Sequence, residues 1–207
     1  MNNVWTSIIF SLVTGIISSS LVVIYFEIRQ NKRHKLSRAH ILERFTRELF
    51  GVLTVIRVAS QLKLNRTSFK DKMDVVKDLE LILGRNNPSV LIDKILNLST
   101  NNHQYIYNQL VQINNSLFII FSHSIAHKTI EDEVSASIAE MQEWISSVLQ
   151  CYITFPEIIE NKSDNTMQTM LITSISNLVE NTFSILTNTL KKHKTSEGLL
   201  RWGSHSS

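Results

Sequence analysis

Apolar residues recur three and four positions apart through most of the chain beyond residue 40. Positions with that spacing lie on one side of an α-helix, so each row predicts a helix with one buried face. No segment alternates apolar and polar residues as a half-buried strand would. We therefore predict an all-α fold. The main rows are Leu42, Phe45, Leu49, Leu53 and Ile56; Met73, Val76, Leu79 and Leu83; Ile106, Leu110, Ile113, Leu117, Ile120 and Ser124; Val134, Ile138, Met141, Ile145, Val148 and Tyr152; and Leu171, Ile175, Leu178, Ile185 and Leu190.

Turn-forming and capping residues divide these rows into separate helices. A turn is expected at 65–67, with Thr67 or Ser68 as the cap of the next helix and Asp71 in its first turn. Pro88 suits the first position of a short helix over 88–98, and a long helix follows over 102–127. The later boundaries are Thr129 with Asp132, Pro156, and Ser163 or Asp164. Because Leu117–Phe121 is apolar on all sides, the 102–127 helix is predicted to be central.

The segment from Val4 to Phe26 contains no charged residue. At about 1.5 Å per residue, such a helix crosses a hydrocarbon core of about 30 Å. A cleaved signal peptide would carry Lys or Arg before the apolar run, and none precedes Val4. A buried core helix remains a third interpretation, but such helices rarely extend this far without a charge. We therefore expect a transmembrane anchor over 1–26.

A basic collar, which we define as residues 27–47, follows the uncharged run at once. It holds seven Lys or Arg and two Glu, whereas the whole chain of 207 residues has a formal charge of only +3. Positive flanks stay on the cytoplasmic side, so the N-terminus is expected outside the inner membrane and the rest in the cytoplasm. Anionic lipid headgroups are the expected ligands of Arg29, Lys32, Arg33, Lys35 and Arg38. Because stacking aromatics are not interleaved with these cations, a nucleic-acid partner is disfavoured.

Small residues recur every four positions within the predicted span, at Ser7, Ser11, Gly15 and Ser19. On a helix they form one narrow stripe at which two backbones can approach closely. This stripe predicts a homo-oligomer, with a pore as a further hypothesis. The alternative is that the hydroxyls bond back to their own helix.

Low counts of turn residues and one cysteine narrow the remaining possibilities. Gly 5 and Pro 2 indicate long helices, and 207 residues fit one domain after the anchor. We expect a juxtamembrane helix over 27–64, a bundle of four to five helices over 65–194 and a disordered tail over 195–207. Cys151 cannot form an internal disulfide and is expected to be a small buried hydrophobe. No phosphate loop or cofactor fingerprint occurs in the chain, so no cofactor is expected.

Two groups of residues have spacings that other proteins use for chemistry. His123, His127 and Glu131 lie four apart, as metal ligands on one helix can, although the helix is expected to break near Thr129. Surface histidines near a helix end are the alternative, and no metal site is assigned. Arg33 and His40 match the Arg-x(4–6)-His pattern and so resemble the helical nuclease domains called HEPN. That resemblance implies cleavage of RNA at a dimer interface by this pair.

The leading functional hypothesis is a non-enzymatic, single-pass membrane protein that self-assembles and acts on or signals to the bilayer. In layout it is similar to small bacterial membrane effectors of antiviral defence, including membrane proteins that accompany RNA-targeting CRISPR nucleases. The alternatives are a membrane-tethered HEPN-like ribonuclease that uses Arg33 and His40, and a non-catalytic scaffold or adaptor that binds a cytosolic protein.

Overall fold

The computed structural model describes residues 2–64, 71–83, 88–127, 132–158 and 164–201. Within its helices, the side chains of 2–23, 31–36, 88–89, 126–127 and 192–201 are not described. Helices account for most of these residues, and no strand occurs among them. The predicted all-α class is thus confirmed. The helices are α1 (Asn2–Ala59), α2 (Lys72–Ile82), α3 (Pro88–Leu96), α4 (Thr100–His127), α5 (Asp132–Thr154), the 3₁₀ helix η1 (Pro156–Ile158) and α6 (Asn165–Arg201).

The chain divides into two compact units, Met1–His40 and Ile41–Ser207, and each is described by itself. The first unit consists of the N-terminal part of α1. Its helix continues without a break through 30–36. The second unit begins within α1 at Ile41 and contains every later helix.

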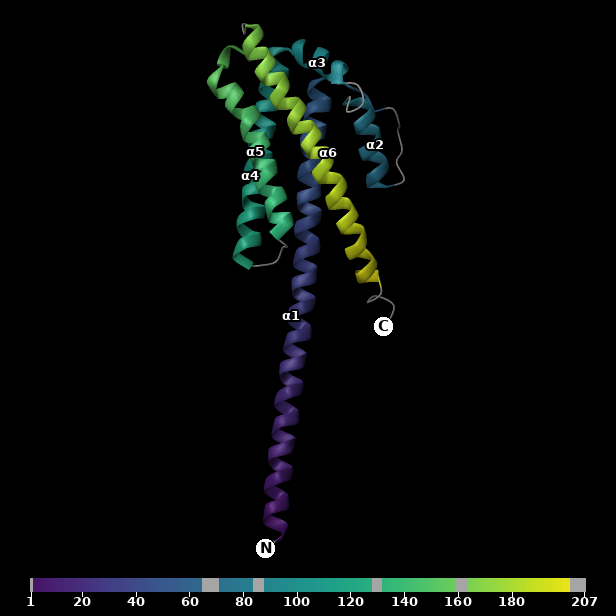
Figure 1. The fold of residues 1–207 in the computed structure, drawn as a ribbon, viewed down its shortest axis with the longest axis vertical. Helices are drawn as coiled ribbons and strands as arrows, with labels where there is room; N and C mark the ends of the chain where they lie inside the picture. Colours follow the sequence, from purple (N-terminus) through teal and green to yellow (C-terminus); the bar gives the residue numbers. More distant parts are fainter. Residues whose placement is uncertain (1, 65–70, 84–87, 128–131, 159–163, 202–207) are drawn as a thin grey trace. The chain divides into compact units, whose positions relative to one another are not determined.

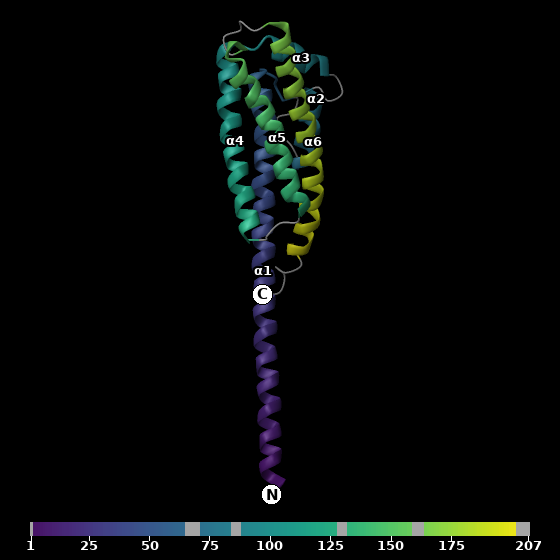
Figure 2. The same ribbon diagram turned by 60° about the vertical axis from the view of Figure 1, so that its left-hand side comes forward.

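The second unit is a helical bundle in which α4, α5 and α6 each pack beside their neighbour in sequence (Figure 1). α4 packs against α5 and α5 packs against α6, while α2 and α3 both contact α6. Short connections at alternate ends make α4, α5 and α6 run antiparallel to their neighbours, which is the up-and-down arrangement expected from the sequence (Figures 1 and 2).

One continuous core holds the bundle together, and it is built from the predicted rows. All five positions predicted on α1 are buried, with Phe45, Leu49, Leu53 and Ile56 at 0% exposure. The rows predicted for α4, α5 and α6 are buried throughout as well. Helical periodicity therefore identified the inward face of every long helix of the bundle correctly.

α1 and α4 approach each other closely inside the bundle. Gly51 of α1 lies against Ile113, whose Cδ1 is 3.4 Å from the position that a Cβ on Gly51 would take. Nearby, the Ser116 hydroxyl of α4 donates a 2.7 Å hydrogen bond to Oε1 of Glu48. A Cβ at residue 51 would be in ordinary van der Waals contact with Ile113, and the hydrogen bond joins the two helices close to that contact.

Side chains cap the starts of two helices. Asp71 is the N-cap of α2, because its Oδ1 accepts a 2.9 Å hydrogen bond from the amide of Asp74. The sequence placed Asp71 inside the first turn, with the cap at Thr67 or Ser68, and these two lie outside the described residues. Asp164 caps α6 through the amide of Met167 at 2.9 Å, as one of the two predicted caps. α6 is helical to Arg201.

The end of α1 has no turn signal in the sequence. The helix ends at Ala59, before the turn predicted at 65–67. The amide of Leu62 bonds to the carbonyl of Arg57, and the amide of Gln61 bonds to that of Val58, both at 3.0 Å. These two bonds form a Schellman motif, which requires a left-handed residue, and Gln61 has a φ of 56°.

Replacing Gln61 with Gly is expected to stabilise the protein by about 1 kcal/mol, because glycine adopts the left-handed region without a Cβ penalty. The measurement is chemical denaturation of the full chain in a mild detergent. Thr54→Gly is the matched control, since Thr54 is exposed in the middle of the same helix. Glycine there should destabilise by about 1 kcal/mol. A loss of stability in both variants would contradict the assignment of the motif.

The prediction that α4 is central was wrong. Phe118 and Ile119 are 61% and 54% exposed, although they belong to the run that is apolar on all sides. α4 lies at the edge of the bundle, with α5 beside it and α6 beyond (Figure 2). Only its inward row packs into the core, so part of its apolar surface faces outward.

Candidate functional site

The stripe of small residues falls within the first unit. α1 is helical from Asn2, so spacing by four keeps Ser7, Ser11, Gly15 and Ser19 on one side of its backbone. Their side chains, however, lie outside the described residues. The stripe therefore stays a prediction.

The basic collar is described in part. Arg29 is exposed and Arg38 is half-buried, while the side chains of Lys32, Arg33 and Lys35 lie outside the described residues. An exposed guanidinium such as that of Arg29 is free to reach a phosphate group. The proposed lipid contacts of the other four residues rest on the sequence.

Large apolar side chains just before and at the start of the collar are exposed. Ile24, Tyr25, Phe26 and Ile28 are 50%, 60%, 60% and 63% exposed, and the rings of Tyr25 and Phe26 meet edge to face with centroids 6.1 Å apart. Within the described part of the chain, no helix is both long and apolar enough to cross a membrane. Most of the predicted span falls on residues 1–23, whose side chains lie outside that part.

The residues predicted for catalysis or metal binding are not brought together by the described structure. His40 is exposed on α1, and the side chain of Arg33 is not described. His123 is exposed on α4, whereas the side chains of His127 and Glu131 are not described. Among the described residues, no three His, Cys, Asp or Glu side chains are grouped as metal ligands. Both predictions remain without a described site.

A buried polar cluster that the sequence did not predict joins α4 to α5. His103 is 4% exposed and Tyr152 is 2% exposed. Nδ1 of His103 and the hydroxyl oxygen of Tyr152 share a hydrogen bond of 3.1 Å, in which the donor depends on the histidine tautomer. The Tyr107 ring packs edge to face on that of Tyr152, with centroids 6.0 Å apart. The cluster thus pairs two polar groups inside a largely apolar core.

Burial dominates the electrostatics of this cluster. Loss of hydration raises the pKa of Tyr152 far above its usual range, and the adjacent Cys151 raises it further. Tyr152 therefore stays a neutral phenol at any physiological pH. Its hydroxyl can hold His103 in place, but it cannot act as a base.

The space beside His103 is too small for an organic substrate. A crevice of about 10 Å³ borders His103, Gln168, Leu171 and Ile158. That volume is near the minimum of about 10–15 Å³ that admits one water molecule. One water molecule is the most that this crevice admits, and an organic cofactor would not fit in it.

Cys151 is buried, as the sequence predicted. It is 7% exposed, and its sulfur lies 3.5 Å from the Ser174 hydroxyl oxygen on α6. Burial against α6 keeps this thiol away from reagents in solution, which agrees with a packing role.

Comparison with known proteins adds no family assignment. No protein-family model, characterised protein or solved structure matches the chain.

Proposed function

We propose that this chain is a single-pass membrane protein that assembles with itself and acts on, or signals to, the bilayer. The observation that carries the proposal is the uncharged run from Val4 to Phe26. As a helix of about 1.5 Å per residue it is about 35 Å long, which matches the hydrocarbon core of a membrane.

The end of the run has the features of a membrane interface. Tyr25 and Phe26 are exposed on α1 next to the exposed Ile24 and Ile28. In water such a cluster would be costly, whereas lipid or headgroups would cover it, and aromatic rings favour this depth. The basic collar follows directly, and each Lys or Arg near an anionic leaflet contributes about 1 kcal/mol of binding. These features support an anchor with the bundle in the cytoplasm.

The effect on the membrane is the second part of the proposal. The stripe from Ser7 to Ser19 supports close contact between anchors, and the assembled anchors would perturb the membrane or form a pore. The setting that we propose is bacterial antiviral defence, on the basis of the layout described above. The bundle would carry the cytosolic input to the anchors.

The anchor is tested by alkaline extraction of membranes from cells that express the full chain. The protein should stay in the membrane pellet. Leu12→Arg with Ile16→Arg should release it, because each charge at the centre of a span costs about 2.5–3.5 kcal/mol. The matched control is Ala139→Arg with Ser146→Arg, at two exposed positions of α5, which should not release it. Release of the unmodified chain by alkali would refute the anchor.

The effect on the membrane is tested separately by uptake of an impermeant dye during expression. Dye uptake should occur with the unmodified chain and be lost in Ser11→Leu with Gly15→Leu, which fills the small-residue stripe. The same variant should remain resistant to alkaline extraction. If dye uptake persists in this variant, the small-residue stripe is not needed for the effect on the membrane, and that part of the proposal is refuted.

A further inference from the structure

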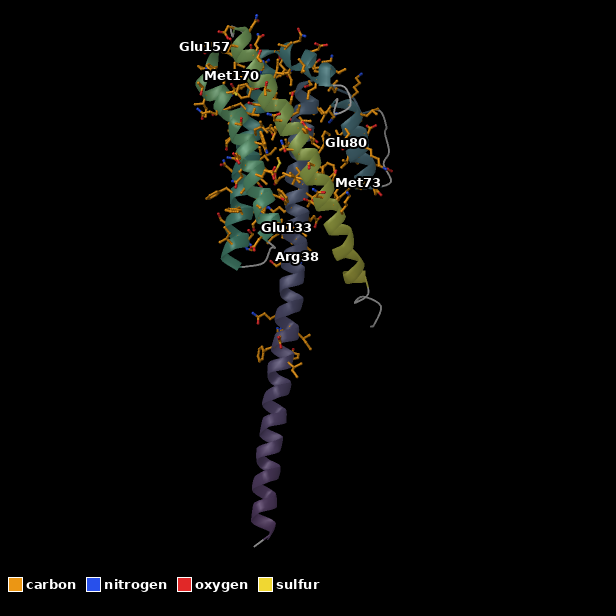
Figure 3. The ribbon with its side chains drawn as sticks, in the orientation of Figure 1. Arg38, Met73, Glu80, Glu133, Glu157 and Met170 are labelled. Carbon is orange, nitrogen blue, oxygen red and sulfur yellow. The ribbon has the colours of Figure 1, made fainter. Side chains whose placement is uncertain are left out.

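α4 differs from the other helices of the bundle in its charge. Its sequence from Thr100 to His127 contains no Asp, Glu, Lys or Arg. Each of the other α-helices that contribute to the bundle contains at least one charged residue. Figure 3 labels three of the charged side chains elsewhere in this unit, namely Glu80 on α2, Glu133 at the start of α5 and Glu157 in η1. α4 is thus a long helix at the edge of the bundle without a single charged residue.

The outward side of α4 carries a regular row of residues. We call it the α4 seam, and its spacing alternates between three and four residues, which is the heptad spacing of a coiled coil. Every member is exposed except Val111, which is half-buried. The members are Asn108, Val111, Asn115, Phe118, Ser122 and Ile125.

The seam is distinct from the row that packs into the core. The inward row of α4, from Ile106 to Ser124, is buried against the bundle. On the seam, Phe118 and Ile125 are 61% and 58% exposed, and Ile119 beside them is 54% exposed. α4 thus carries large apolar side chains on its outward side as well as in its inward row, and the structure of a single chain buries only the inward row. Neighbouring exposed apolar residues of this kind mark an interaction surface.

We propose that the α4 seam binds the α4 seam of a second copy of this chain. In a two-fold contact, each residue meets its own equivalent or a near neighbour on the other copy. A charged face would then place like charges opposite each other, and the seam avoids this because it has no charge. The polar members Asn108, Asn115 and Ser122 recur every seven residues, so each can pair with its own equivalent and fix the register of the two helices.

Other occupants fit the seam less well. Anionic lipid headgroups and nucleic acids are bound through Lys and Arg, and the seam has neither. The pairing rests on the proposed function, in which the chain assembles with itself, and we take it as parallel because an Asn at a heptad position pairs with its own equivalent in parallel two-stranded coils. Parallel pairing places each seam residue close to its own equivalent.

The test uses the full chain in membranes and one added cysteine at a time. Asn115→Cys and Ser122→Cys lie on the seam, seven residues apart, and both positions are exposed. Ser146→Cys is the matched control, because Ser146 is exposed on α5. The unmodified chain is a second control, since Cys151 is buried. Under mild oxidation, the two seam variants should form mostly disulfide-linked dimers, since paired heptad positions lie within the Cα separation of about 4.4–6.8 Å that a disulfide needs. The controls should stay monomeric.

A charge on the seam provides an independent measurement. Phe118→Lys in the Ser122→Cys background should abolish the crosslink, because two equivalent cations would face each other. Thr173→Lys in the same background is the control, since Thr173 is exposed on α6. Equal crosslinking of the residue 122 and residue 146 variants, or no crosslinking of the residue 115 and residue 122 variants, would refute the proposed pairing of the seams. Loss of membrane binding without loss of the crosslink in Phe118→Lys would assign the face to lipid and also overturn it.

The test of the seam and the test of the anchor give separate results. Alkaline extraction of the same samples reports anchoring independently of the crosslink. An anchored chain with no crosslink refutes the seam alone. A released chain that still crosslinks at residue 122 refutes the anchor, while pairing through the seam stands.

Discussion

Replacing Leu117 with Ala is expected to lower the free energy of unfolding by about 2–5 kcal/mol, whereas Phe118→Ala should change it by less than about 0.5 kcal/mol. The two residues are adjacent in sequence, and both are large and apolar. Leu117 is 0% exposed and Phe118 is 61% exposed. Truncation of Leu117 removes buried methyl groups and leaves a cavity, while truncation of Phe118 removes atoms that water already contacts in the single chain.

The measurement is denaturation of the full chain in detergent, followed by far-ultraviolet circular dichroism. Protein concentration is lowered until the unfolding transition no longer depends on it. Pairing through the α4 seam then does not contribute to the free energy of unfolding of the unmodified chain or of Phe118→Ala. Ile120→Val is a graded second test, because Ile120 is 2% exposed and the loss should be about 0.5–1.5 kcal/mol. Similar losses in Leu117→Ala and Phe118→Ala would mean that α4 buries both faces within one bundle.

This pair of residues also marks how far the sequence alone predicts the fold. The inward rows of α1, α4, α5 and α6 were all predicted, because only a buried face imposes helical periodicity on apolar residues. The position of α4 was not, because the run from Leu117 to Phe121 is apolar on every side. Such a run is compatible with a central helix and with an edge helix whose outer face contacts another molecule. Sequence periodicity does not distinguish the two, and the exposure of Phe118 does.

Helix ends were predicted where a local chemical signal exists. Pro88 and Asp164 act as expected, as the first residue of α3 and the cap of α6. At α2, three residues that can act as caps lie within five positions, and Asp71 is the N-cap. The end of α1 was missed because Gln61 occupies a left-handed position at which glycine would have been the sequence signal.

The buried polar cluster shows why a site is harder to predict than a fold. His103 and Tyr152 are 49 residues apart and meet only because α4 packs on α5. A signal was nevertheless present, since His103 lies three residues before Ile106 and so extends the buried row of α4. Tyr152 was placed on the buried row of α5, but periodicity does not say which polar group on another helix lies opposite. Only the packing of α4 on α5 shows that His103 is the partner of Tyr152.

Tyr152→Phe is expected to make the protein's stability less sensitive to alkaline pH. Burial raises the pKa of Tyr152 in the folded state, whereas in the unfolded chain tyrosine ionises near pH 10. Above about pH 10 the unfolded state therefore binds fewer protons than the folded state. By linkage, the stability of the unmodified protein falls by up to about 1.4 kcal/mol per pH unit from this one group. Below about pH 10 the contribution is fully present and constant.

The test compares the slope of stability against pH between about pH 9 and 11.5. Phenylalanine at residue 152 also loses the hydrogen bond to His103, so its curve should be lower at neutral pH and flatter in alkali than that of the unmodified chain. Val148→Ala is the matched control, because it removes buried atoms one turn earlier on α5 without removing a titratable group. It should lower the curve and keep the alkaline slope. Parallel curves for Tyr152→Phe and the unmodified chain would mean that the phenol ionises in the folded protein as readily as in water, and that α4 and α5 do not exclude solvent from the ring.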